Sequence, residues 1–388
     1  DWPFSFVNVG HRLIAMNGDT TSFIWDGVLA NNLYTLGIAG PAAAPVVAAG
    51  AAGNLNGAYR WAYLYRDSVN DVNSALSPFS TSLNLAALQA TVTVLASTNP
   101  RVNQIQIFRT RSTGQAPMRL VSTVANAGAA IPDNVGDIAL GAFPQEGGQP
   151  PNTRFGAVFN GTFFLFNSPQ GERFSRLHFS NPGRIEEFPA ANFIDFDESD
   201  GGPATGLNVV ANQLVTNKQH KTMHLVGTSP DNYAQQTPVA KRGMNWAYGG
   251  VLVDDALVYA DKEAPYIYDA SQNRKIADDD NICPVQGSWN NIINASDSAA
   301  TLSYIGDEVI AMHLPRRRQV LFSCADRNDT RTAANENTQC LVWNYGQAGQ
   351  PWALYDFGFD SWGIWRDNFS GNETVVFVNH AADGWVFV

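Results

Sequence analysis

Carboxylates and histidines are the side chains of this sequence whose spacing suggests chemistry. One acidic run stands just before Gly201-Gly202 and contains Asp195, Asp197, Glu198 and Asp200. Several carboxylates on one loop are suitable ligands for Ca²⁺, and these four are the metal candidates of the chain. The run lacks the alternating ligand spacing and distal Glu of a calcium loop, so a solvated acidic loop is the favoured interpretation. The same two interpretations apply to Asp278, Asp279 and Asp280.

His220 and His224 have the spacing of a zinc-binding helix. Lys221, however, stands where the H-E-x-x-H motif of metalloproteases needs its Glu general base. We expect both histidines to flank a hairpin, where hydrogen bonding or solvation is the ordinary role. The cysteines Cys283, Cys324 and Cys340 lack C-x-x-C spacing, which predicts buried apolar residues rather than a disulfide framework or a zinc site.

Glycoside hydrolysis is the enzymatic alternative, because it requires two carboxyl groups about 5 to 9 Å apart. The nominal candidates are Glu186, Glu187, Asp254, Asp255, Asp356 and Asp360. The sialidase turn Ser-x-Asp-x-Gly-x-x-Trp is absent, and residues 360–363 do not reproduce it. The sequence also shows no nucleophile elbow, P-loop or dinucleotide fingerprint. We therefore predict a protein that is not an enzyme and has no cofactor.

Charge and hydropathy restrict the partners. The formal net charge of −11 disfavours sequence-specific binding of nucleic acid, although it suits a conduit along which DNA slides. No apolar stretch of 18 residues and no secretory signal pattern is present, so no membrane insertion is expected. The first residue is Asp1, which suggests that the gene product extends further.

An exposed hairpin tip is predicted at Arg316, Arg317 and Arg318. These arginines would either pair with Asp278 to Asp280 of a neighbouring subunit or keep the turn soluble.

Repeated hairpins predict an all-β fold. The first hairpin runs from residues 12–16 through Asn17-Gly18 to residues 22–25, and the second passes through Asn160-Gly161. Asn-Gly between apolar runs is a strong hairpin signal. Weaker copies begin at residues 206, 250, 302 and 362. Their spacing of about 40 to 60 residues is typical of the four-stranded blades of a β-propeller, although the number of blades stays open.

A segment of different character interrupts the hairpins. We expect an Ala/Pro/Gly linker at residues 41–56, then an inserted fibronectin- or immunoglobulin-like β-sandwich at residues 57–149. Its strands alternate apolar and polar side chains, whereas residues 83–88 predict a short helical turn. The propeller would then consist of residues 1–40 and 150–388.

The succession of signals, more than any single one, resembles a known class of proteins. The residues that carry it include Asn17-Gly18, Leu36-Gly37-Ile38, residues 57–63, residues 77–80, residues 105–110, Asp133, Asp137, residues 179–183, residues 187–189, residues 204–207 and residues 223–227. This order resembles β-propeller proteins of tailed-bacteriophage virions, most closely the tail nozzle or tail-tube hub of short-tailed phages.

The resemblance implies a structural subunit without catalytic residues. Such a protein is made in the cytoplasm of the host bacterium and then resides in the tail or neck of the virion. It is expected to form a ring with itself, as a hexamer, to contribute to the conduit for DNA ejection and to dock other tail, adaptor or fibre proteins. The alternative is a secreted β-propeller that binds or hydrolyses glycans.

Overall fold

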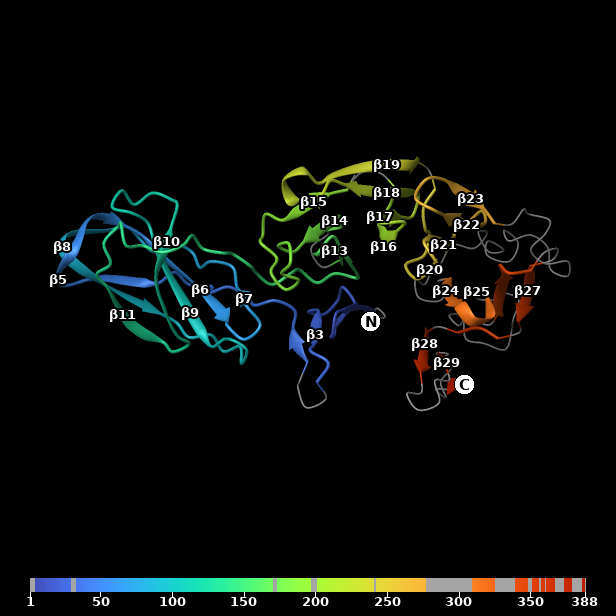
Figure 1. Cartoon of the computed structure of the whole chain (residues 1–388), viewed down its shortest axis with the longest axis horizontal. Helices are drawn as coiled ribbons and strands as arrows, with labels where there is room; N and C mark the ends of the chain where they lie inside the picture. Colours follow the sequence, from blue (N-terminus) through green and yellow to red (C-terminus); the bar gives the residue numbers. More distant parts are fainter. Residues whose placement is uncertain are drawn as a thin grey trace, which may run out of the picture. The chain divides into compact units, whose positions relative to one another are not determined.

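The computed structural model describes most of the chain as short β-strands (Figure 1). The described residues are 4–28, 33–169, 173–196, 201–240, 242–276, 309–324, 339–347, 351–355, 357–359, 361–366, 373–378 and 386–387. They fall into two compact units, Asp1–Asp195 and Phe196–Val388, and each is described by itself. Within them the helical elements with defined bounds are the 3₁₀ turns η2 (Pro230–Asn232) and η3 (Pro315–Arg317). The predicted all-β class is confirmed.

The first unit contains two four-stranded antiparallel sheets whose strands follow one another in chain order. One consists of β1 (Ser5–Val9), β2 (Arg12–Met16), β3 (Phe23–Trp25) and β4 (Tyr34–Thr35). The other consists of β12 (Phe155–Phe159), β13 (Thr162–Ser168), β14 (Arg173–Phe179) and β15 (Phe193–Asp195). Ile14, Met16, Phe163 and Leu165 are buried between the two sheets, which therefore pack face to face.

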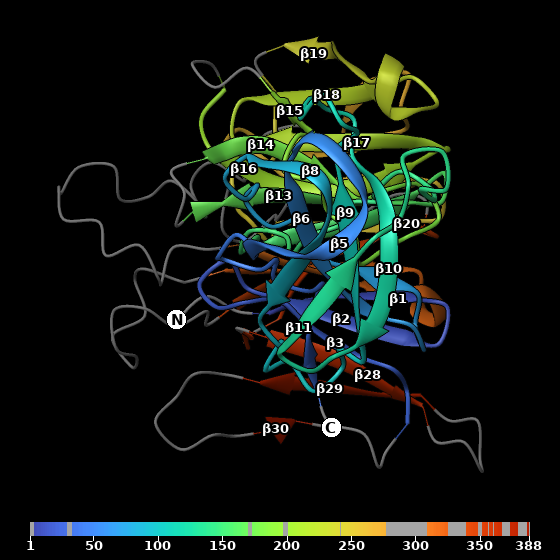
Figure 2. The ribbon, with the colours of Figure 1, turned by 90° about the vertical axis from the view of Figure 1, so that its left-hand side faces the viewer.

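Between these sheets in the sequence lies a β-sandwich of two further sheets (Figure 2). The four-stranded sheet has the order β10 (Arg119–Ala125), β9 (Gln104–Arg109), β6 (Trp61–Asp67) and β7 (Val72–Asn73). The three-stranded sheet has the order β11 (Ala129–Asp133), β8 (Leu83–Val94) and β5 (Val46–Tyr59). One hydrophobic core contains Trp61, Tyr63 and Ile105 from the first sheet and Leu55 and Val92 from the second.

Two local predictions are wrong within the sandwich. The Ala-rich segment predicted as a linker forms most of β5, because its backbone pairs with β8 and its small side chains fit an exposed sheet edge. Residues 83–88 belong to β8 and not to a helical turn. Ala87 has φ +53°, and the β5–β8 register shifts nearby. This irregularity breaks the two-residue alternation by which a strand is recognised.

The second unit repeats the four-stranded pattern. Its first sheet consists of β16 (Ala204–Val210), β17 (Gln213–Lys218), β18 (Lys221–Val226) and β19 (Ala234–Ala240). Its second consists of β20 (Gly250–Val253), β21 (Ala256–Ala260), β22 (Pro265–Tyr268) and β23 (Asn273–Lys275). Its third consists of β24 (Ile310–Leu314), β25 (Gln319–Cys324), β26 (Gln339–Asn344) and β27 (Trp352–Tyr355). A three-stranded sheet follows, with β28 (Ser361–Arg366), β29 (Glu373–Val378) and β30 (Val386–Phe387).

Successive sheets of the second unit also share apolar cores. Val215, Met244 and Tyr259 lie in a cluster between the first and second sheets. Val258 and Phe322 lie in a cluster between the second and third. A sheet with two apolar faces can be buried on both sides, so the layers continue from one sheet to the next.

Turn residues explain why the hairpins form where the sequence predicts them. Asn160 and Gly161 form a two-residue turn between β12 and β13, with φ of +47° and +71°. Two positive φ angles are the requirement of a type I′ turn, which Asn-Gly meets best. Asn17 acts differently, because its Oδ1 accepts hydrogen bonds from the amides of Asp19 and Thr20. This Asx turn joins β2 to β3 through a longer loop.

Candidate functional site at the base of the sandwich

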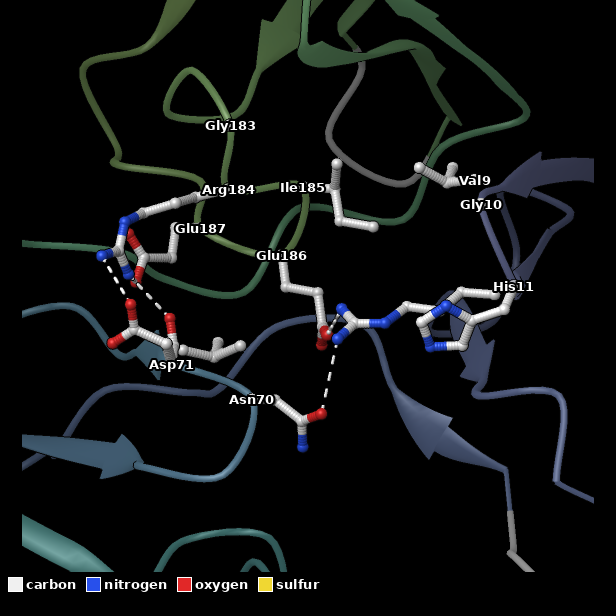
Figure 3. Close-up of a pocket in the computed structure, with 12 residues that line it drawn as sticks. Val9, Gly10, His11, Asn70, Asp71, Gly183, Arg184, Ile185, Glu186 and Glu187 are labelled. Atoms are coloured by element: carbon white, nitrogen blue, oxygen red, sulfur yellow. Dashed lines mark hydrogen bonds and ion pairs between the residues drawn. The ribbon is translucent and has the colours of Figure 1, made fainter.

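A cleft of about 470 Å³ lies where the sandwich meets the four-stranded sheets of the first unit (Figure 3). Three loops line it: the β1–β2 turn with His11, the β6–β7 hairpin with Asn70 and Asp71, and the β14–β15 loop with Arg184. The sandwich contributes the second loop, and the sheets contribute the other two. We call this region the junction.

Glu186 is the central acid of the junction, and its side chain is only 3% exposed. Its Oε1 accepts a hydrogen bond of 2.9 Å from Arg12 Nη1, and its Oε2 accepts one of 2.7 Å from Arg101 Nη1. Arg101 Nε lies 3.3 Å from Asp67 Oδ2. Burial alone lowers the pKa of Arg101, but the bond to Glu186 and the nearby carboxylates raise it above its ordinary value. The arginine therefore joins an acid of the sandwich to an acid of the sheets.

Glu187 forms a second set of contacts beside the first. Its carboxylate accepts hydrogen bonds from the Asn73 amide at 2.9 Å, Arg184 Nη1 at 3.1 Å and Asn181 Nδ2 at 3.2 Å. Burial raises the pKa of Glu187, and these bonds oppose that rise. Arg184 also binds the more exposed Asp71, with 2.8 Å between Nη2 and Oδ2 (Figure 3).

Hydrogen bonds from the protein occupy both buried carboxylates of the junction. Both oxygens of Glu186 and both oxygens of Glu187 accept hydrogen bonds from the protein. A glycosidase needs one acid that can deliver a proton and one that can attack or activate water. Asp254 and Asp255 occupy an exposed turn between β20 and β21, whereas Asp356 and Asp360 lie outside the described residues. The described candidates thus show no pair prepared for glycoside hydrolysis.

The predicted metal candidates are placed differently from one another. Asp195, at the end of β15, binds Arg176 through both oxygens, at 2.6 and 2.8 Å. The carboxylate of Asp195 therefore forms an ion pair with Arg176. Asp197, Glu198 and Asp200 lie outside the described residues, as do Asp278, Asp279 and Asp280. The residues that the structure describes contain no group of three His, Cys, Asp or Glu side chains arranged to hold a metal ion.

The remaining candidates of the second unit have ordinary roles. His224, on β18, is buried and forms a short hydrogen bond with Tyr268 of β22. Burial lowers the pKa of His224 and raises that of Tyr268. Cys324 and Cys340 are buried, as predicted, while Cys283 lies outside the described residues.

Arg316, Arg317 and Arg318 lie at an exposed tip between β24 and β25. The predicted hairpin position is therefore confirmed, and the predicted contact with a neighbour stays a prediction. Arg318 has φ +54°, and its guanidinium lies 6.0 Å from the ring centre of Tyr345.

Sequence reasoning missed the junction. Arg12 and Arg101 are 174 and 85 positions from Glu186, so no local spacing brings them together. Another buried charge, Arg109 in the sandwich, belongs to a strand that the sequence identified by its alternation. Its Nε lies 3.0 Å from Asp133 Oδ2, and both side chains are almost completely buried.

Comparisons with known proteins assign no family. No family model matches the chain, and no curated protein matches it. Among solved structures, the computationally designed Ika8 protein matches with 10% identity over 99% of this chain and 95% of that one, at a TM-score of 0.31. Apo AztD from Citrobacter koseri matches with 11% identity over 91% and 73%, at 0.34. Sqt1 from Saccharomyces cerevisiae matches with 8% identity over 100% and 96%, at 0.33. These structures are β-propellers.

The described residues include no helix with the length and hydropathy needed to span a membrane.

Proposed function

We propose that the four-stranded sheets are blades of a single β-propeller into which the sandwich is inserted. Consecutive pairing, as in β12-β13-β14-β15, is the strand order of a propeller blade. The first strands of successive sheets contact each other within each unit: β1 contacts β12 in the first, and β16 contacts β20 and β20 contacts β24 in the second. Blades around a central axis have their first strands adjacent in this way.

We further propose that the protein is a structural subunit of a tailed-phage particle. It would form a ring in the tail nozzle or tail tube, contribute to the DNA conduit and dock neighbouring tail proteins. The order of sequence motifs, from Asn17-Gly18 to residues 223–227, suggests this class. The observation that carries the proposal is the junction. There the carboxylates of Glu186 and Glu187 accept hydrogen bonds that hold the inserted sandwich against the sheets.

A fixed projecting domain is useful to a scaffold. The sandwich has its own hydrophobic core and is joined to the sheets by charged contacts. It would therefore present its outer surface to a neighbour at a defined angle. The net charge of −11 agrees with a conduit that repels the phosphate backbone of passing DNA.

The direct test is electron microscopy of the purified protein, alone and with tail proteins of a short-tailed phage. Closed rings, or incorporation into a tail assembly, are the expected result. A strict monomer that fails to associate with any tail protein would overturn the proposal. Release of reducing sugars, or tight binding on a glycan array, would instead support the glycan-specific propeller.

The arginine tip provides a sharper test of assembly. We expect the double variant Arg316→Glu/Arg317→Glu to weaken ring formation, because it reverses the charge of an exposed tip that would otherwise attract a neighbour's carboxylates. Arg318 is left unchanged because of its positive φ and its contact with Tyr345. The matched control is Arg274→Glu/Lys275→Glu, which makes the same charge change at exposed positions of β23. Equal assembly of both variants would remove the tip from the interface.

A further inference from the structure

Among the described residues, the sandwich and the sheets of the first unit belong to separate hydrophobic clusters. The sandwich cluster includes Trp61, Tyr63 and Val92, whereas the cluster between the sheets includes Ile14, Phe163 and Phe188. No residue belongs to both clusters. Between them lie the charged side chains of the junction. Each part can therefore retain its own core when the two parts separate.

The junction has an inner and an outer layer of charge. The inner side chains of Arg101, Asp67, Glu186 and Glu187 are at most 6% exposed. The outer ones, Arg12, Arg184 and Asp71, border the cleft, and their exposed fractions are 21%, 25% and 53%. Water and ions reach the outer layer first. Charged groups also regain hydration when such a contact opens, which partly offsets the lost ion pairs.

Backbone contacts complete the junction. The Gly147 amide donates to the Ser74 carbonyl at 3.1 Å, and the Phe188 amide donates to the Gly148 carbonyl at 3.2 Å. A Cβ at Gly147 would lie 2.0 Å from the Asn73 carbonyl oxygen, so only glycine permits this approach. The returning chain, the sandwich and the β14–β15 loop thus meet through a few identifiable amides.

We infer that the junction is a latch, which releases the folded sandwich from the sheets when Glu186 loses its arginines. The ion pairs of Arg12 and Arg101 with Glu186 hold the closed state, and the hydrogen bonds of the Asn73, Gly147 and Phe188 amides belong to that state. Because the sandwich and the sheets have separate hydrophobic clusters, opening the junction should cost less than unfolding either part. The inference depends on the contacts of the first unit and not on the proposed place in a virion.

Amide hydrogen exchange of the full chain distinguishes release from unfolding. In Glu186→Gln, we expect exchange of the Asn73, Gly147 and Phe188 amides to accelerate at least about tenfold, because the open state becomes more populated. The amides of β6 and β9, inside the sandwich, should keep their protection. Small-angle scattering should show a larger maximum dimension. The control Asp195→Asn breaks an ion pair elsewhere on the same sheets and should change none of these values.

A second variant, Arg12→Gln, tests the latch in case Glu186→Gln does not fold. Arg12 is partly exposed, and its substitution leaves the ion pair of Arg101 with Glu186 in place. A smaller acceleration at the same three amides supports the latch. Rising ionic strength should accelerate these amides in the unmodified protein as well. Unchanged exchange in both variants would overturn the inference. So would equal acceleration of the junction amides and of β6 and β9, because the parts would then open only by unfolding together.

Discussion

The sandwich and the four-stranded sheets outside it differ in the polar groups that they bury. The sandwich encloses a charged guanidinium, that of Arg109, between Asp133 and the ring of Tyr59, whose centre is 4.4 Å from the guanidinium carbon. Trp61 donates a further hydrogen bond to Asp133. The sheets outside the sandwich also bury charged side chains, among them Lys218 and Glu187, and they enclose in addition the pair of His224 and Tyr268. Buried ions in both regions require complete partners, whereas histidines kept neutral by burial make the sheets alone sensitive to protonation.

The largest effect should come from removing the acid of the sandwich core. Asp133→Ala leaves Arg109 with its charge buried and Trp61 without its acceptor, so we expect a loss of about 3 to 5 kcal/mol in the free energy of unfolding of the sandwich. Denaturant unfolding followed by Trp fluorescence measures it. Asp137→Asn, at a partly exposed partner of Arg109, should cost much less. Equal losses would show that burial does not determine the cost.

A smaller side chain in the core between the two sheets should cause the next largest loss in the free energy of unfolding. Leu165→Ala opens a cavity between the two sheets of the first unit and should cost about 2 to 4 kcal/mol. The loss should appear in amide exchange of β12 and β13 while β6 and β9 keep their protection. Loss of protection in the sandwich as well would contradict the independence of the two cores.

Mild acid should destabilise the four-stranded sheets outside the sandwich more than the sandwich, without any mutation. Burial, with the charge of Arg176, lowers the pKa of His178 from 6.5 to about 4. A histidine with a lowered folded-state pKa contributes stability that is present above pH 6.5 and is lost as the pH falls toward 4. The pKa values of His224 and His313 are lowered in the same direction. The sandwich strands, residues 46–133, contain no histidine.

We therefore expect amide protection of β14, β18 and β24 to fall between pH 6.5 and 4 by more than that of β6 and β9. His178→Gln should flatten the dependence at β14. A parallel fall in both regions, unchanged by His178→Gln, would mean that these histidines do not cause it.

The smallest effect should come from the ion pair of Arg176 with Asp195. Asp195 is 39% exposed, so solvent weakens the pair despite its two hydrogen bonds. Asp195→Asn should change the free energy of unfolding by less than about 1 kcal/mol. A loss comparable to that of Asp133→Ala would contradict the role assigned to burial.

The sequence predicted what local patterns encode. Alternating apolar residues and Asn160-Gly161 located β12 and β13 because strand period and turn conformation are local properties. The strand β5 was missed because its Ala and Gly side chains carry no alternation, and its partner contains the irregular Ala87. The strand β1 was missed because none of its residues is fully buried, so its sequence carries a weak apolar signal. The junction depends on side chains brought together by tertiary folding, so no spacing could reveal it.

The outer edge of β5 has a consequence for solubility. This strand of 14 residues has no charged side chain and, apart from one bridge between Ala58 and Thr113, pairs only with β8 among the described strands. Long uncharged edges invite strands of other molecules and can initiate aggregation. Its register shifts at Ala49, Ala52 and Leu55 interrupt the row of free amides and carbonyls. A strand of another molecule could therefore pair with β5 only over short stretches. The irregular backbone reduces edge-to-edge aggregation, as lysine side chains do on other edge strands.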